Sequence, residues 1–174
     1  LVEFAKPLGS AKYIRMETFK DPEVASGQRA GWYPWPYVEG IAIDEAGDIT
    51  TARITAHIAK IEGKKVGYTT SDGVYIQNQL MMRGDCTGPI SSAFVLKDPT
   101  VDFAVLECAR GGILKNGLAF QNCDVAIVTN VAADHMGLGG INTLEQMAKV
   151  KAVVPETVFP HGYAVLNADD DLVY

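Results

Sequence analysis

Three runs of this sequence are apolar without polar alternation, and they constrain the fold more than any other feature. The runs read KVGYT at residues 65–69, VDFAVL at 101–106 and DVAIVT at 124–129. Strands of this kind are buried on both faces, as in a parallel sheet that is covered by helices. Helix-like segments lie between or beside them at residues 50–61, 90–96 and 143–154, and shorter strands are expected at 41–43 and 164–166. This alternation predicts an α/β domain with a doubly wound, mostly parallel sheet.

Each expected strand is followed by a polar or glycine-bearing segment. In chain order these segments read DEAGD, SDG, ECARGG, NVAADH and NADDD. Ligands of open α/β sheets bind beyond the carboxyl ends of the strands. The ligand site is therefore expected at the edge of the sheet where these segments meet.

The composition limits the classes of partner. The chain has 174 residues, of which 48% are hydrophobic, enough for one well-buried domain. Its net charge of −6 argues against nucleic acid, whose backbone is bound largely by Lys and Arg. No stretch reaches the roughly 18–20 apolar residues of a membrane span and no secretory leader is evident, so we expect no membrane partner and a cytoplasmic location.

The three cysteines, Cys86, Cys108 and Cys123, are odd in number and lack C-x-x-C spacing. We expect them to be reduced thiols in or near the core, in preference to a metal or redox site.

The chain divides near residue 40 into an N-terminal arm or linker (1–40) and a domain (41–174). The arm has no sustained helical or strand periodicity, and its WYPWP cluster predicts an extended segment at residues 32–37. Two alternatives remain for this arm: its tryptophans pack on its own domain, or they contact a neighbouring domain or subunit.

Several motifs resemble the central domain of cyanophycin synthetases, which belong to the Mur ligase family. They are TSDGVYI, GDCTGP, DPTVDFAVLECARGGIL, CDVAIVTNVAADHMGLGGINTLEQMAKVKAVVPETV and GYAVLNADDD, and they span roughly residues 49–171. The resemblance implies the P-loop-like fold of Mur ligase central domains. It implies an ATP-dependent ligase in which a phosphorylated carboxylate is attacked by an amine such as that of arginine, with Mg²⁺ and ATP as cofactors.

The same resemblance suggests partners. They are an ATP-grasp ligase domain of the same or a larger protein, a polymer of aspartate and arginine, and further copies of the chain in a homo-oligomer. Complete Mur ligases continue beyond the NADDD motif, so the chain is expected either to be a piece of a longer protein or to lack the covering domain.

The resemblance assigns the metal and catalytic residues. Glu107 matches a magnesium-ligating glutamate, and His135 matches a histidine directed at a second metal or the phosphate. From the residues alone, Glu107 could instead pair with Arg110, and His135 could cap Asp134. Both residues are expected at the carboxyl ends of adjacent strands, where with Asp48 they could hold a divalent cation weakly.

Lys151 matches the lysine that many Mur-type ligases carbamylate, so it joins His135 as a catalytic candidate. A helix-surface lysine is the alternative, and Lys149 is a competing register. Asn167 matches the asparagine that contacts adenine, with a turn cap as the alternative. The other expected nucleotide contacts are Gly47, Asn130 and Asp170.

The first polar segment departs from the family. Aligned through Arg53, DEAGDITTAR falls where the family has GTNGKTTTTR, so Asp48 replaces the phosphate-binding lysine and Ile49 the magnesium-binding threonine. Such loops hold phosphate through main-chain N–H groups and the lysine. Each added like-charge pair about 4 Å apart costs roughly 4 kcal/mol before screening. ATP binding in this loop is therefore expected to be poor, and a catalytically silent, structural or oligomerisation domain remains the alternative function.

A long hairpin or lid-like excursion is expected at residues 71–89. As a hypothesis it reaches the polymer or a neighbouring subunit through Tyr75, Met81 and Met82, with Asp72 and Asp85 as ligands for arginine side chains. The alternative is a hairpin that packs its methionines on its own core.

Overall fold

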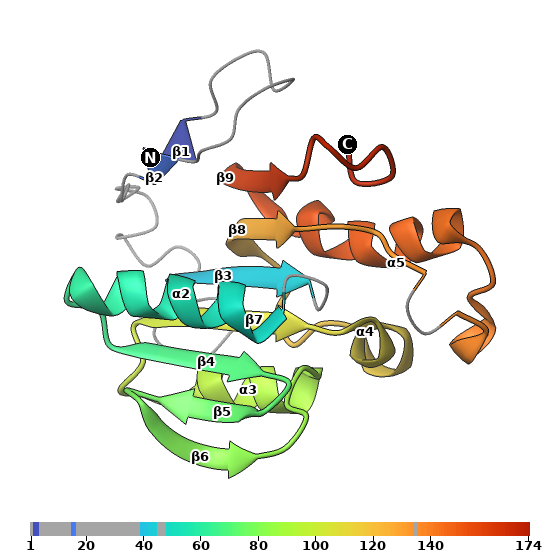
Figure 1. Ribbon diagram of the computed structural model, residues 1–174. Coiled ribbons are helices and arrows are strands. Elements are labelled where there is room, and N and C mark those ends of the chain that lie inside the picture. Colours follow the sequence, from blue (N-terminus) through green and yellow to red (C-terminus); the bar gives the residue numbers. More distant parts are fainter. Residues whose placement is uncertain (1, 4–14, 17–38, 45–47, 134–135) are drawn as a thin grey trace.

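The computed structural model describes residues 2–3, 15–16, 39–44, 48–133 and 136–174. Within these residues, seven strands form one sheet in the order β6-β5-β4-β7-β3-β8-β9 (Figure 1). The strands are β3 (Glu39–Asp44), β4 (Val66–Thr70), β5 (Gly73–Ile76), β6 (Gln79–Arg83), β7 (Phe103–Cys108), β8 (Cys123–Val128) and β9 (Val158–Leu166). The helices are α2 (Asp48–Ile61), α3 (Pro89–Lys97), α4 (Arg110–Asn116) and α5 (Leu144–Glu156), with a short 3-10 turn, η4 (Leu138–Gly140). Two short strands, β1 (Val2–Glu3) and β2 (Arg15–Met16), pair with each other.

The five strands β4, β7, β3, β8 and β9 pair in parallel, which confirms the predicted fold class. The hairpin expected at residues 71–89 is also present. Its strands β5 and β6 pair antiparallel and extend the sheet beyond β4, so the sheet is mixed at this end. The expected excursion is therefore part of the sheet.

Helices cover the two faces of the sheet unequally. On one face α2 buries Ala52, Ala56 and Ala59 against Val66 and Val105. On the other face Val95 of α3 and Val154 of α5 join Ala104 and Leu106 in a second core cluster. Alternate residues of β7 therefore enter different cores, as its uninterrupted apolar run predicted. Figure 1 shows α2 and α3 on opposite sides of the sheet.

The main differences from the sequence prediction concern β7, β9 and α4. β7 extends through Cys108, so Glu107 lies inside the strand. β9 begins at Val158, whereas a strand was expected only at 164–166. The helix α4 was not predicted, because its sequence RGGILKN contains two adjacent glycines, which are poor helix formers.

The order of the strands corrects one expectation about the site. β7 and β8 are not adjacent, because β3 lies between them and pairs with both. The apolar runs predict which segments are strands, but the order of parallel strands depends on the path of each crossover connection. The division of the chain near residue 40 stays a prediction, since most of the arm lies outside the described residues. None of the helices in the described part is long and apolar enough to span a membrane.

Candidate functional site

The described residues that directly follow the parallel strands lie at one edge of the sheet. The chain leaves β7, passes beyond β3 and enters β8, so β3 marks the point where the strand order reverses. Ligands in such sheets bind at this switch point, beyond the carboxyl ends of the strands. All five site candidates that the structure describes belong to β7, α5 or the segments after β8 and β9: Glu107, Asn130, Lys151, Asn167 and Asp170.

Glu107 is one residue from the end of β7 and is only 2% exposed. Its main-chain N–H donates to Thr69 Oγ1 of β4 at 3.1 Å, which ties the two strand ends together. Arg110, the alternative partner from the sequence, is also buried, at 7% exposed, in the first turn of α4. A buried carboxylate requires a cation or hydrogen-bond donors nearby. Glu107 therefore places a buried carboxylate group next to the switch point.

Lys151 is the inward-facing lysine of α5. It shares the buried side of the helix with Met147 and Val154, at i, i+4 and i+7 spacing, and is 5% exposed. Lys149 is exposed, so a helix-surface position describes Lys149 and is wrong for Lys151. Which of the two lysines has the catalytic role stays a prediction. The Nζ of Lys151 donates to the main-chain oxygen of Asn130 at 2.8 Å. A capping box of Thr143 and Gln146 fixes where α5 begins, and with it the position of Lys151.

Asn167 caps a turn, as the alternative from the sequence proposed. Its Oδ1 accepts from the N–H of Asp169 at 3.0 Å, and its Nδ2 donates to the oxygen of Thr129 at 2.9 Å. Its side chain therefore closes the turn after β9 and also reaches the segment after β8.

Asp170 makes two comparable contacts. Its Oδ2 accepts from the N–H of Val131 at 2.7 Å, and its Oδ1 accepts from the N–H of Leu172 at 3.0 Å. The hydrogen bond from Val131 is the main reason that the pKa of Asp170 lies below its usual range.

Several predicted residues cannot be placed. Gly47, Asp134 and His135 lie outside the described residues, as does the side chain of Asp48. The predicted cation site of Glu107, His135 and Asp48 therefore stays a prediction. Among the residues that are described, no three His, Cys, Asp or Glu side chains are grouped as a metal site.

A polar cluster that sequence reasoning missed links α2 to the turn after β4. Arg53 Nη2 donates to Asp72 Oδ2 at 2.5 Å and to the hydroxyl of Tyr75 at 3.1 Å. Asp72 also accepts from the hydroxyls of Thr70 and Tyr75. The ring of Tyr75 stacks on Tyr68, with centroids 4.7 Å apart. In the sequence, Arg53 is one of several polar residues on a helix. Nothing in that pattern indicated that its partner, Asp72, lies nineteen residues further along the chain.

These contacts weaken the hypothesis that the hairpin binds arginine side chains. Asp72 already pairs with Arg53, and Asp85 Oδ1 accepts from both the N–H and the hydroxyl of Thr87. Met82 packs against the core, whereas Met81 is 47% exposed. The alternative of a hairpin packed on its own domain therefore holds for Met82, and Met81 is the methionine that faces solvent.

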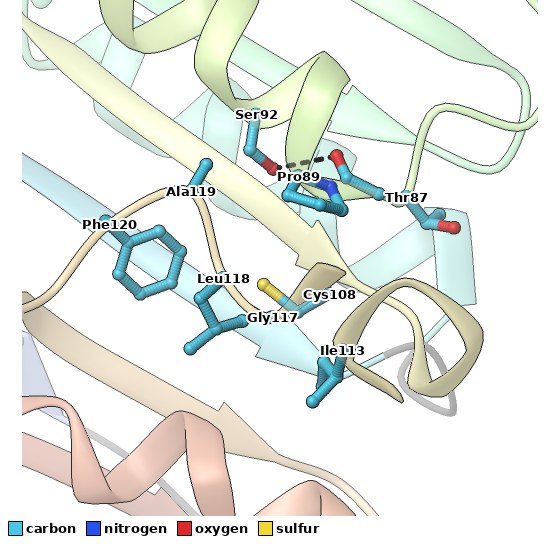
Figure 2. Close-up of a pocket in the computed structure, with 10 residues that line it drawn as sticks. Thr87, Pro89, Ser92, Cys108, Ile113, Gly117, Leu118, Ala119 and Phe120 are labelled. Atoms are coloured by element: carbon cyan, nitrogen blue, oxygen red, sulfur yellow. Dashed lines mark hydrogen bonds between the residues drawn. The ribbon is translucent and has the colours of Figure 1, made fainter. Parts of the chain in front are cut away.

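A small pocket lies between the first turn of α3 and the segment that follows α4 (Figure 2). Its lining includes Cys108, Ile113 and Phe120, and none of its lining residues carries a charge. Ser92 Oγ donates to the oxygen of Gly88 at 3.3 Å, so its hydroxyl is already used. The pocket therefore has no side-chain charge with which to hold phosphate.

All three cysteines are buried free thiols, as predicted. Burial raises the pKa of Cys123 to about 11. Since the thiolate is the reactive form, Cys123 is inert at neutral pH.

Comparison with known proteins identifies the family of the chain. The family model described as the Mur ligase middle domain matches residues 46–173. The cyanophycin synthetase of Crocosphaera subtropica (strain ATCC 51142 / BH68) is 66% identical over 127 residues, which cover 73% of this chain and 15% of that protein. The cyanophycin synthetase of Geminocystis herdmanii (strain PCC 6308) is 61% identical over 127 residues, or 73% of this chain and 14% of that protein. The chain thus spans about one seventh of the length of these curated relatives.

A solved structure of UDP-N-acetylmuramoyl-L-alanyl-D-glutamate--2,6-diaminopimelate ligase is similar in fold. The match has a TM-score of 0.66 and 23% identity, and it covers 85% of this chain and 30% of that one. At this identity the likeness concerns the fold alone. The family match and the sequence relatives confirm the resemblance drawn from the motifs, and the chain belongs to the Mur ligase middle-domain family.

Proposed function

We propose that this chain is the central domain of a cyanophycin synthetase-type ligase. Such a ligase would activate a carboxylate with ATP and form an amide bond to an amino acid such as arginine. The observation that carries the proposal is the 66% identity to a cyanophycin synthetase over 127 residues. An ATP-grasp ligase domain, a polymer of aspartate and arginine, and further copies of the chain are the partners that this function implies.

The described residues fit the implied cofactors in part. Glu107, a carboxylate buried at the switch point, suits a magnesium ligand, because magnesium is held by one or two carboxylates with waters and phosphate oxygens. Magnesium and ATP, when bound, would supply the phosphoryl group and neutralise its charge. Asn130 is on the same edge, and its Oδ1 is buried with no hydrogen-bond partner among the described residues. Its amide oxygen can accept a hydrogen bond from a bound nucleotide.

A second candidate function is a catalytically silent domain that supports an active ATP-grasp domain. The acidic DEAGD segment favours it, because Asp44, Glu45 and Asp48 stand where a phosphate loop needs main-chain N–H groups and a lysine. Acidic residues at this position suit the start of a bare helix, whose dipole they complement. On this argument the chain keeps the Mur ligase fold but binds ATP poorly.

Calorimetric titration with ATP and magnesium distinguishes the two candidates. We expect residues 1–174 to show no binding tighter than about millimolar, because carboxylates replace the charge that holds phosphate. A variant with the complete family loop, made by Asp44→Gly, Glu45→Thr, Ala46→Asn, Asp48→Lys and Ile49→Thr, should bind measurably.

Three outcomes separate the ideas. Micromolar binding by the unaltered chain would contradict the silent domain. Binding only by the restored variant would support a nucleotide site disabled by its loop. No binding by a folded restored variant would contradict a nucleotide site at this edge.

A further inference from the structure

Three consecutive residues after β8 are held by side chains from other parts of the chain. Asn167 Nδ2 donates to the oxygen of Thr129 at 2.9 Å, and Lys151 Nζ donates to the oxygen of Asn130 at 2.8 Å. Asp170 Oδ2 accepts from the N–H of Val131 at 2.7 Å. The segment 129–131 forms none of the strand pairs of β8, so these contacts take the place of sheet pairing.

The holding side chains are themselves fixed. Asn167 Oδ1 accepts from the N–H of Asp169, and Asp170 Oδ1 accepts from the N–H of Leu172. Lys151 is buried on the inner side of α5. The side chain of Val131, 8% exposed, packs with Met147 of α5 and with Leu172. The segment is therefore attached both to α5 and to the turn that follows β9.

We propose that Lys151, Asn167 and Asp170 act together as a clamp that positions Asn130, and this rests on the proposed nucleotide site. Asn167 uses both its amide nitrogen and its amide oxygen in protein contacts, and Asp170 uses both carboxylate oxygens. They act on the site through the segment that they hold. The acceptor that the clamp leaves available is Asn130 Oδ1, which suits an amino or hydroxyl group of a bound nucleotide.

The clamp makes Lys151 depend on Asp170, although the two side chains belong to different elements. Lys151 Nζ donates to the oxygen of Asn130, and Asp170 accepts from the N–H of Val131, which is the other end of the same planar peptide group. Loss of the Asp170 carboxylate should free the segment and expose the amine of Lys151. Asp170 also interacts with Lys151 through its charge. If that charge alone mattered, Asp170→Asn and Asp170→Ala would change Lys151 equally.

The test is competitive labelling of lysine amines with acetic anhydride on residues 1–174, read by mass spectrometry. Lys149 is the internal reference, because it is exposed on the same helix. In the unaltered chain Lys151 should label far more slowly than Lys149. Asp170→Ala should raise Lys151 labelling about tenfold or more, the factor expected for one hydrogen bond to a charged group.

Graded variants separate the clamp from a general loss of structure. Asp170→Asn keeps one acceptor oxygen for Val131 and should give a smaller increase. Asp169→Ala should change nothing, since the main-chain N–H that Asp169 donates to Asn167 remains. Hydrogen exchange should accelerate at the Val131 amide in Asp170→Ala while the amides of β4 stay protected.

Unchanged labelling of Lys151 in Asp170→Ala would overturn the clamp, and so would equal increases in Asp169→Ala. If the amides of β4 also lose protection in Asp170→Ala, that variant is unfolding. Lys151 labelling in Asp170→Asn, compared with the unaltered chain, then decides whether the clamp exists. No nucleotide enters these measurements, so their failure is independent of the titration that tests the proposed function.

Discussion

Gly162 is a residue at which β9 approaches β8 closely. A Cβ at this position would lie 2.4 Å from the main-chain oxygen of Asp124 and 2.7 Å from Val158 Cγ1. The pairing of β8 with β9 changes register just here, between Cys123 and Val125. The glycine thus lets an irregular strand stay close to its neighbour, which is the usual reason for glycine inside a strand.

Substitution of this glycine should therefore cost stability. We expect Gly162→Ala to lower the free energy of unfolding by roughly 1–3 kcal/mol, because main-chain atoms must move to admit the methyl group. Gly111→Ala is the matched control: its Cβ would meet no atom within 4 Å, and it lies in α4. There alanine should stabilise by about 0.5–1 kcal/mol. Urea unfolding measures both, and equal midpoints for the two variants would contradict the crowding at Gly162.

Asp170 should also give the chain an acid-sensitive contribution to stability. The N–H of Val131 lowers the pKa of Asp170 below its ordinary value of 3.8. A group whose pKa is lower in the folded state stabilises the fold above its unfolded pKa, and the contribution is lost as pH falls through the folded pKa. The stability difference between the unaltered chain and Asp170→Asn should be constant at neutral pH and should shrink below pH 3.8. Urea unfolding across this range tests it, and a difference that grows on acidification would contradict the assigned sign.

At the scale of elements, the apolar runs predicted the parallel strands because burial on both faces leaves a signal within each strand. The order of the strands, the length of β9 and the helix α4 were not predicted, since they depend on crossovers, on an irregular strand pair and on tertiary packing. The same division applies to the site. The expected strand ends predicted that Glu107 and Asn130 lie at the same edge of the sheet. They did not predict that Asn167 and Asp170 hold the segment 129–131.

The hairpin of β5 and β6 closes through a turn that its sequence does not favour. Gln77 and Asn78 both have positive φ, 47° and 71°, which is typical of a two-residue turn in which Asn-Gly is preferred. Such a conformation costs a non-glycine residue about 1–2 kcal/mol. Gln77→Asn combined with Asn78→Gly should therefore raise the free energy of unfolding by about 1 kcal/mol.

Gly63 provides a control for this turn, because there the substitution introduces backbone strain and does not relieve it. Its φ is 83°, and a Cβ there would meet no atom within 4 Å, so Gly63→Ala tests backbone strain alone. It should destabilise by about 1 kcal/mol. If Gly63→Ala destabilises the chain while the turn variant has no effect, the strain assigned to Gln77 and Asn78 is contradicted.

At the scale of the whole molecule, the outer side of α2 carries a row of exposed isoleucines. Ile54, Ile58 and Ile61 are 54%, 44% and 69% exposed, and they repeat at helical spacing. The last turn of α2 lies toward the amino ends of the parallel strands (Figure 1), and β3 begins there at Glu39. Residues 32–37, with the tryptophans of the sequence, immediately precede that strand. Their placement lies outside the described residues, and the packing of the arm on its own domain stays a prediction.

Tryptophan fluorescence tests that prediction directly, because the chain has 2 tryptophans and both, Trp32 and Trp35, are in the arm. If the arm packs against α2, the two rings should resist quenching by acrylamide, and Ile58→Asp or Ile61→Asp should increase quenching and move the emission to longer wavelength. A charge placed among apolar contacts disfavours burial of the rings. Ile90→Asp is the matched control, since Ile90 is 80% exposed but belongs to α3 on the opposite face of the sheet. Full quenching in the unaltered chain would show that the arm does not pack on this domain, which would favour the alternative of a contact with a neighbouring domain or subunit.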